Sequence, residues 1–187
     1  MDADMLGWVI QEISAVTLAA VFALGAWHKV RGYPRFVASL EAYRLFPQAL
    51  TRLVAPVVVF TECAAAGLSL TGWGPGSLLG FVLLGLYTGA IALNLARGRS
   101  DIDCGCGEAA TPLSGWLLGR NGVLMGLALL GSSGYAAADP AGWWVVAGGA
   151  LLMLLAYQSL EQLLANLALA TTPARPAHAT ADAGSDG

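Results

Sequence analysis

The sequence predicts an all-α protein, a polytopic bundle of transmembrane helices. Of its 187 residues, 57% are hydrophobic and only 11% are charged, whereas soluble domains carry about 25% charged residues. Five apolar runs stand out, each near the ~20 residues that cross a bilayer core. Because a backbone in lipid must satisfy its own hydrogen bonds, each run is expected to be a helix. The net charge of −3 gives no indication of a nucleic-acid partner.

The expected spans form a single transmembrane domain over residues 1–170. They cover about residues 8–30, 50–70, 77–96, 113–130 and 143–164. Glycine is scattered through these runs, which is typical of helices that pack closely in lipid. Residues 171–187 are small, polar and rich in proline, so we expect a disordered C-terminal tail. The first run ends in WHKVRGYPR and is not expected to be a cleaved signal peptide.

The segment between the first two spans, RGYPRFVASLEAYRLFP, predicts a short interfacial helix that Pro47 ends. Its apolar residues fall on one helical side; they are Phe36, Leu40, Tyr43 and Leu45. Residues 72–76, GWGPG, predict a tight turn. Thr111 and Pro112 predict the start of the fourth span, with the threonine as N-cap and the proline in the first turn.

The basic residues predict the orientation in the membrane. With five spans, all nine Lys and Arg residues fall on the side that holds the 97–112 loop and the C-terminus. The positive-inside rule then places this side in the cytoplasm and the N-terminus outside. We expect a multi-pass protein of a bacterial inner membrane, with the lipid bilayer as its surroundings.

Polar side chains within the apolar runs predict an internal pocket. Charged groups in a span are unfavourable and usually face the bundle interior. Glu62, near the middle of the second run, is the deepest acid. The half of the membrane nearest the 97–112 loop contains His28, Lys29, Asn94, Arg120, Asn121, Gln158 and Glu161. We therefore expect a pocket that opens toward the loop, with Glu62 at its floor.

Structural roles are the alternative for several of these residues. Lys29, Arg97 and Arg99 are expected to extend toward lipid headgroups. His28 could be a histidine that packs at the membrane interface. Cys63 is expected to be a small, buried residue of a helix that takes no part in redox chemistry.

Two further structural roles concern the acid in the second run. Arg120 could pair with Glu62 or with Glu161 as a clamp between helices. Glu62 could also be a protonated group that hydrogen-bonds between helices. The functional alternative is that Glu62, Arg120 and Asn121 handle protons or hold a quinone-like electron partner.

Cys104 and Cys106 are the candidate catalytic residues. Separated by one residue, they can form a disulfide only in a small, strained ring, which is easily reduced. Gly105 helps because glycine tolerates unusual dihedral angles. Two alternatives stay open. The two thiolates could bind a soft metal such as Cu(I), although a zinc site usually needs four ligands, or they could be unconnected loop thiols.

The loop and the helix that follows it resemble the MauE family of methylamine-utilisation membrane proteins. That family shows a C-x-C-F-G loop, a Leu-Ser element and a helix bearing Arg-Asn and a Leu. The matching residues are Cys104, Cys106, Leu113, Ser114, Arg120, Asn121 and Leu124. The front half, with GAWHKVRGYPRFVASLEAYRLFP and FTECAAAGLSL, is similar to the same family and its DoxX-like relatives. One departure is that no Phe follows Cys106, which affects the packing of the loop.

The resemblance implies a thiol–disulfide redox protein of the membrane. It implies a four-helix core like that of vitamin K epoxide reductase-like bundles, and a role in the redox maturation of partners such as methylamine dehydrogenase. Maturing exported proteins would need an external site, whereas the basic residues place the loop in the cytoplasm. A thioredoxin-like protein or a partner redox enzyme is the expected partner. A membrane protein that binds or transports a soft metal or a small hydrophobic ligand, and a non-catalytic scaffold for a partner redox enzyme, are the other candidates.

Overall fold

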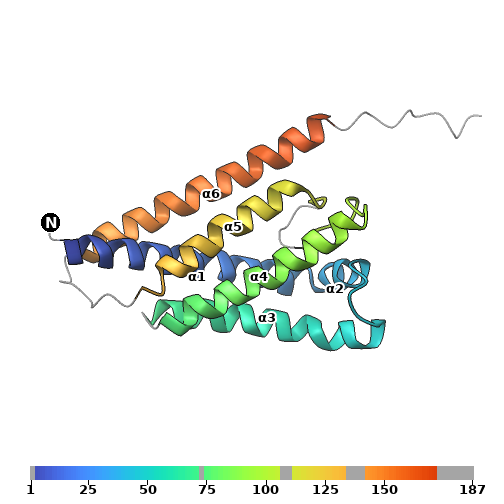
Figure 1. Ribbon diagram of the computed structural model, residues 1–187, viewed down its shortest axis with the longest axis horizontal. Helices are drawn as coiled ribbons and strands as arrows, with labels where there is room; N and C mark the ends of the chain where they lie inside the picture. The colour runs from blue at the N-terminus through green and yellow to red at the C-terminus, as the bar shows by residue number, and fades with distance from the viewer. Residues whose placement is uncertain (1–2, 72–73, 106–110, 134–141, 172–187) are drawn as a thin grey trace, which may run out of the picture. The chain divides into compact units, whose positions relative to one another are not determined.

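A computed structural model describes residues 3–71, 74–105, 111–133 and 142–171, and the described chain is helical with one isolated β-bridge (Figure 1). The helices are α1 (Ala3–Arg31), α2 (Tyr33–Ala42), α3 (Gln48–Leu70), α4 (Gly74–Ala96), α5 (Gly115–Leu130) and α6 (Trp143–Thr171). Residues up to Leu155 form one compact unit, and the rest of α6 belongs to a second. The all-α prediction is confirmed, while the predicted tail lies outside the described residues except for Thr171.

Among the described residues, four helices are long and apolar enough to cross a bilayer, namely α1, α3, α4 and most of α6. The apolar helix α5 has 16 residues, which makes it about 24 Å long against a hydrocarbon core of about 30 Å. Large apolar side chains face outward, such as Phe60 and Leu152, each 73% exposed. Such a surface suits lipid rather than water, as in a multi-pass membrane protein.

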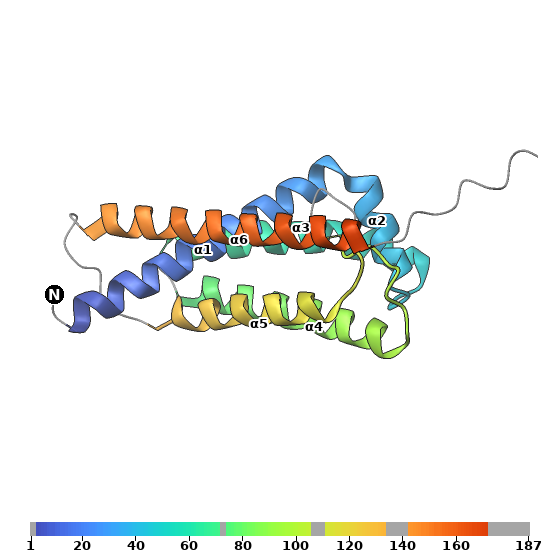
Figure 2. The same ribbon diagram turned by 90° about the horizontal axis from the view of Figure 1, so that it is seen from above.

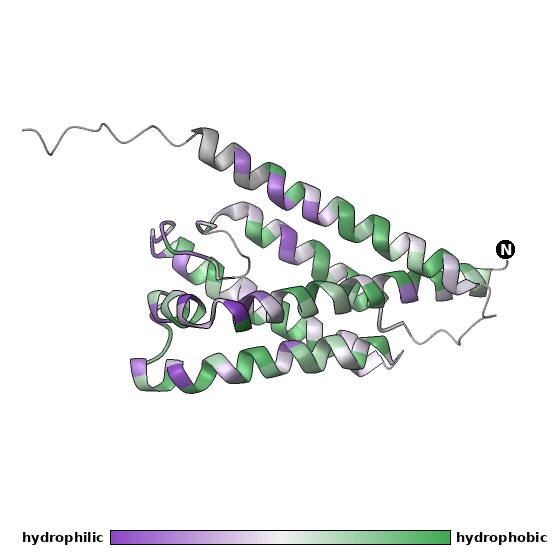
Figure 3. Cartoon of the chain, turned by 180° about the vertical axis from the view of Figure 1, so that it is seen from behind, coloured by the Kyte–Doolittle hydropathy of each residue, from purple (hydrophilic) through white to green (hydrophobic). Residues whose placement is uncertain are grey.

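Helices α1, α3, α4 and α5 form a four-helix core in the first unit. Helix α1 contacts α3, α4 and α5, and α4 contacts both α3 and α5. The chain runs back and forth, so that α2 and the connection between α4 and α5 lie at the same end of this core (Figures 1 and 2). Hydrophilic residues of α2 and of the neighbouring ends of α3 and α4 gather there (Figure 3). A four-helix core is therefore observed, as the sequence predicts.

Two glycines allow the start of α4 to lie directly against its neighbours. A Cβ atom at Gly76 would lie 2.4 Å from the carbonyl carbon of Leu68 and 2.4 Å from the amide nitrogen of Ser69, both backbone atoms of α3. A Cβ atom at Gly80 would lie 2.7 Å from the Phe22 ring of α1. Close backbone approach at small residues is characteristic of helix packing in membranes.

Three expected boundaries differ in the structure. Helix α2 ends at Ala42 rather than at Pro47, because Arg44 adopts a left-handed φ of 49° that turns the chain; Pro47 instead precedes α3. Gly74 and the two residues after it form the first turn of α4 rather than a loop, and residues 72–73 lie outside the described part. Helix α5 begins at Gly115 with an extended Ser114 as its N-cap.

The third difference arises because the segment before α5 pairs with the other side of the cysteine loop. Pro112 forms the isolated antiparallel bridge with Asp103. Thr111 accepts a 2.8 Å hydrogen bond from the backbone N–H of Cys104. These two residues therefore close the loop and do not cap the helix.

Candidate functional site

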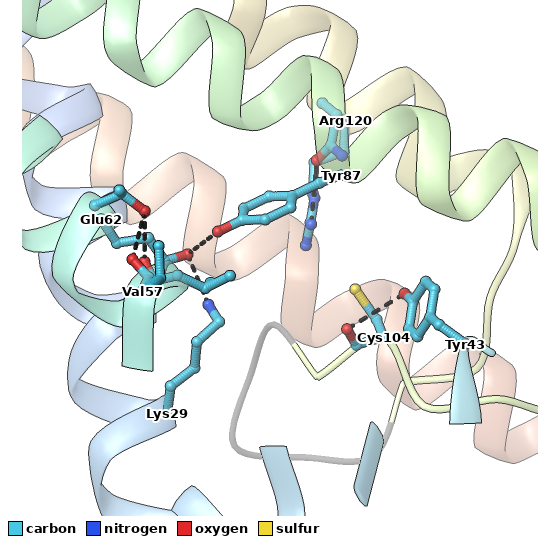
Figure 4. A network of polar contacts seen from close by, with 10 residues as sticks. Lys29, Tyr43, Val57, Glu62, Tyr87, Cys104 and Arg120 are labelled. Carbon is cyan, nitrogen blue, oxygen red and sulfur yellow. Dashed lines mark hydrogen bonds and ion pairs between the residues drawn. The ribbon is translucent and has the colours of Figure 1, made fainter. Parts of the chain in front are cut away.

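A buried ion pair joins three helices of the core. The Lys29 Nζ of α1 donates a 2.8 Å hydrogen bond to Glu62 Oε1 of α3, and the Tyr87 hydroxyl of α4 donates to the same oxygen at 2.8 Å. Lys29 is 5% exposed and Glu62 is 2% exposed. Figure 4 shows Lys29 and Tyr87 converging on this carboxylate. The prediction that Glu62 faces the interior is confirmed, and its cationic partner is Lys29.

Two other expectations about this pair are wrong. Lys29 does not extend to lipid headgroups, because its ammonium lies between the rings of Phe36, at 5.6 Å, and Tyr87, at 5.8 Å, while it pairs with the acid. Glu62 is not clamped by Arg120, since the bonds of its Oε1 come from Lys29 and Tyr87. A cation inside the bundle is favourable only when it neutralises an opposite charge there.

The second carboxylate oxygen of Glu62 is unusual. Glu62 Oε2 is buried and makes no hydrogen bond within the described part of the chain. Gly25 on α1 lies next to the pair, since a Cβ atom there would be in van der Waals contact with Lys29 Nζ, at 3.5 Å, and Glu62 Oε1, at 3.8 Å. A buried polar atom without a partner is unfavourable. The pair thus retains one unused acceptor.

Cys104 and the lysine of this pair line a common cavity. A cavity of about 70 Å³, here called the inner cavity, is lined by Lys29, Phe36, Tyr43, Tyr87 and Cys104 among others. Cys104 is 8% exposed, and the Tyr43 hydroxyl donates a 3.4 Å hydrogen bond to its carbonyl oxygen (Figure 4). Cys104 and the lysine of the ion pair therefore line the same cavity.

Asp103 holds the cysteine loop in place. Its Oδ1 accepts hydrogen bonds from the backbone N–H groups of Gly105, at 3.2 Å, and Thr111, at 3.1 Å. Its Oδ2 accepts two from Arg35 of α2, at 3.1 and 2.9 Å. One carboxylate thus ties both sides of the loop together and attaches them to α2.

Gly105 has the unusual backbone conformation that the sequence predicts. Its φ of +69° lies in the left-handed region, which glycine adopts without strain. A Cβ atom there would also lie 3.2 Å from the Cβ of Ser39. The loop therefore rests directly on α2.

A second cavity of about 230 Å³, here called the basic cavity, adjoins the inner one, because Lys29 and Phe36 line both. It is lined also by His28, Arg31 and Arg35, and Gly105 forms part of its wall. His28 is thus half-buried at this cavity, next to the ion pair rather than within it.

The remaining predicted pocket residues lie elsewhere in the core. Asn94 is fully buried; it accepts a hydrogen bond from Arg99, which also donates to the Ala42 carbonyl. Arg99 therefore joins α4 to the end of α2 and does not extend to headgroups as expected. Arg120 donates to the Oδ1 of the buried Asn121. None of Asn94, Arg120 and Asn121 lines the two cavities.

The other cysteines complete the account of the predicted site. Cys106 lies outside the described residues, so the geometry of the pair is not described. Cys63 is exposed on α3, which corrects the expectation of a buried residue; its neighbour Glu62 takes the inward position. Within the described ranges, no group of three or more His, Cys, Asp or Glu side chains is arranged to hold a metal ion.

Several residues of the site were not predicted from the sequence. Tyr87 was hidden in an apolar run, although a phenol within a span is itself a signal for a polar partner. Asp103 and Arg35 are far apart in the chain, and nothing in their spacing indicates that they pair.

Comparison with known proteins identifies the family. The family model described as methylamine utilisation protein MauE matches residues 6–134. The chain belongs to the MauE family. It is 34% identical to the methylamine utilization protein MauE of Paracoccus denitrificans, over 95% of this chain and 94% of that protein. It is 35% identical to the MauE protein of Paracoccus versutus, over 87% of this chain and 89% of the relative. No solved structure matches.

Membership of the MauE family confirms the resemblance inferred from the cysteine-loop segment. The match spans α1 to α5, and so includes the ion pair, the inner cavity and the loop. The likeness to vitamin K epoxide reductase-like bundles stays a prediction.

Proposed function

We propose that this chain is an integral membrane thiol–disulfide redox protein in which Cys104 and Cys106 cycle between dithiol and disulfide. The observation that supports this most is the placement of Cys104, buried at a cavity that also contains an ammonium group. A neighbouring cation favours the reactive thiolate form of a cysteine. A thiol with a purely structural role needs no such neighbour.

The proposed cycle exchanges electrons with a partner protein of the thioredoxin-like class. Cys104 and Cys106 lose two protons and two electrons and form a disulfide, and the partner's disulfide takes them up and becomes a dithiol. The same exchange runs in reverse when the partner is the reductant. In keeping with the names of its relatives, the chain would support the redox maturation of a protein used in methylamine utilisation.

The two cysteines have different parts in this proposal. Cys104 is buried against the inner cavity and out of reach of a protein partner, so Cys106 makes the mixed disulfide and Cys104 resolves it. The variant Cys104→Ser should therefore accumulate a mixed disulfide with the partner, and Cys106→Ser should not. The reverse pattern would refute this assignment.

A quinone ring with its tail fits poorly in the inner cavity beside Cys104. The inner cavity of about 70 Å³ has room for about five water molecules, at 10 to 15 Å³ each. This is less than a quinone ring with its tail requires. No step of the proposed cycle therefore passes through a quinone.

The proposed location of the loop is the cytoplasmic face of the bacterial inner membrane. Basic residues gather at the end of the core where the loop lies, which the positive-inside rule associates with the cytoplasm. A membrane-impermeant thiol reagent should fail to label Cys106 in intact cells and should label it after the cells are opened. Labelling in intact cells would reverse the orientation and point to exported substrates.

The redox proposal itself is tested on purified protein in a bilayer mimic. The protein is equilibrated in buffers from strongly oxidising to strongly reducing, and its thiols are then counted by mass after alkylation. We expect a Cys104–Cys106 disulfide that forms and disappears across the series, with a Cys63→Ser variant behaving identically. A pair that stays in one state throughout would refute the proposal.

A further inference from the structure

We propose that Lys29 is a positioning residue that changes its partner with the state of Cys104. In the resting protein its ammonium pairs with the carboxylate of Glu62. When the Cys104 thiol ionises and loses its proton to water, the ammonium turns from the carboxylate to the thiolate. This inference rests on the proposed redox function and names the groups that would control it.

The first support is the shared cavity. Lys29 and Cys104 both line the inner cavity, as does Phe36 of α2. The Lys29 ammonium is 5.6 Å from the Phe36 ring, and a Cβ atom on Gly105 would lie 3.6 Å from the same ring. A lysine has a flexible four-carbon stem, so its charge can move across a space of this size.

The second support is the unused acceptor on Glu62. Its Oε1 already receives two hydrogen bonds, from Lys29 and Tyr87, while the buried Oε2 receives none in the described part of the chain. The carboxylate thus receives the ammonium through one oxygen only. Tyr87 can still donate to Oε1 after the lysine leaves.

The protons and charges balance in this exchange. Before it, the site contains a thiol, a carboxylate and an ammonium; afterwards it contains a thiolate, the carboxylate and the same ammonium, and one proton has passed to water. The ammonium then lies beside the new negative charge, which would be unfavourable in the low-dielectric interior without such a partner. The thiolate is available to attack the Cys106–partner disulfide, in which the partner's sulfur is released as a thiolate and takes up a proton from water.

Other charged groups near the loop are engaged elsewhere. Arg35 of α2 pairs with Asp103, and Arg99 after α4 bonds to Asn94 and to the Ala42 carbonyl. The titratable and charged groups that line the two cavities or bond beside them are His28, Lys29, Arg31, Arg35, Tyr43, Glu62, Tyr87, Arg99 and Asp103. Among the charged ones, Lys29 is the cation that lines the cavity of Cys104.

The test follows the pH dependence of alkylation of Cys104 by N-ethylmaleimide. It uses full-length protein in nanodiscs, in a Cys63→Ser/Cys106→Ser background where Cys104 is the single thiol. The plateau rate at high pH reports access to the thiol, and the midpoint reports how readily it ionises. A merely structural role changes the plateau and leaves the midpoint in place.

The two partners of the ion pair should shift the midpoint in opposite directions. Lys29→Met removes the cation and should raise the midpoint by at least about one pH unit, a tenfold loss of thiolate below it. Glu62→Gln removes the competing carboxylate and should lower the midpoint. Lys29→Arg should keep the wild-type midpoint, and Arg52→Met, which removes an exposed cation that lines neither cavity, should change nothing.

One further variant covers the risk that Lys29→Met does not fold. The double variant Lys29→Met/Glu62→Leu replaces the ion pair by apolar groups and leaves no unpaired charge. Its midpoint should rise as in the single variant. The inference would be overturned if the midpoint of the double variant stayed within 0.3 pH unit of wild type. It would also be overturned if Lys29→Met and Glu62→Gln moved the midpoint in the same direction. If the midpoints were unchanged but the Cys104–Cys106 pair still cycled between dithiol and disulfide, the proposed redox function would remain valid without a role for Lys29.

Discussion

Replacing Asp103 should open the cysteine loop while the helices stay folded. In Asp103→Ala, the backbone N–H groups of Gly105 and Thr111 lose their acceptor, and Arg35 loses its ion pair. Two such hydrogen bonds are worth about 1 kcal/mol each. The Arg35 pair is partly exposed, with side chains 46% and 21% accessible, and adds at most about 1 kcal/mol.

The loop should therefore lose about 2 to 3 kcal/mol of local stability, which corresponds to about a thirtyfold or larger rise in the open fraction. The buried thiol of Cys104 reacts through that open state. We expect its plateau alkylation rate, in the background with a single thiol, to rise by the same factor. Asp103→Asn keeps an oxygen for the backbone bonds and should raise the rate less than about fivefold.

The exposed Asp101 provides the matched control. Asp101→Ala changes the charge of the same loop by the same amount and should leave the rate within twofold of wild type. Circular dichroism and size-exclusion profiles verify that each variant is folded. If folded Asp103→Ala reacts no faster than the Asp101 control, the carboxylate does not hold the loop and the argument fails.

Three more predictions concern the core and the loop. Gly76→Ala should lower the thermal unfolding temperature in detergent, because its Cβ would lie 2.4 Å from the backbone of α3, a clash that costs about 1 to 3 kcal/mol. Gly89→Ala is the control and should leave this temperature unchanged, because the space around Gly89 is open. Equal effects of the two substitutions would contradict this prediction. Glu62→Leu alone should destabilise the fold by about 3 to 5 kcal/mol, because it leaves the buried ammonium of Lys29 unpaired. Adding Lys29→Met should restore most of this loss. If urea titrations show instead that the two losses add, the two residues are not coupled. Gly105→Ala should raise the alkylation rate of Cys104 about fivefold or more, since a left-handed alanine is strained by about 1 to 2 kcal/mol, and an unchanged rate would show that the strain is relieved elsewhere.

The sequence predicted the bundle well because apolar runs of bilayer length have few alternatives to a helix. It also located Glu62 in the interior, since an acid in the middle of a span must face the protein. It failed on Lys29 because its position at the end of a span fits a headgroup contact as well as an inward pair. Only the packing of α1 on α3 brings the two charges within 2.8 Å.

Boundaries were predicted less well, for a local reason. Thr111 and Pro112 have the sequence of a helix start, yet they pair with the opposite side of the loop. The N-cap preference of a threonine is worth about 1 kcal/mol. The backbone pairing that closes the loop offers two hydrogen bonds at the same place, and Asp103 adds further ones. Pairing between distant residues cannot be inferred from local propensity, so Arg35 was also missed.

Basic residues have two roles in the proposals for this protein: they set its orientation in the membrane, and one of them, Lys29, lies inside the bundle at the site of Cys104. The proposed orientation rests on nine basic residues, and a lysine buried in an ion pair does not contact headgroups. Eight basic residues remain when Lys29 is left out, and all are expected on the same side of the membrane. The proposed orientation therefore does not depend on Lys29. Exposed arginines such as Arg44 and Arg52 contact neither cavity. Replacing them can therefore alter the orientation without touching the ion pair, whereas replacing Lys29 should alter the chemistry of Cys104 and leave the orientation unchanged.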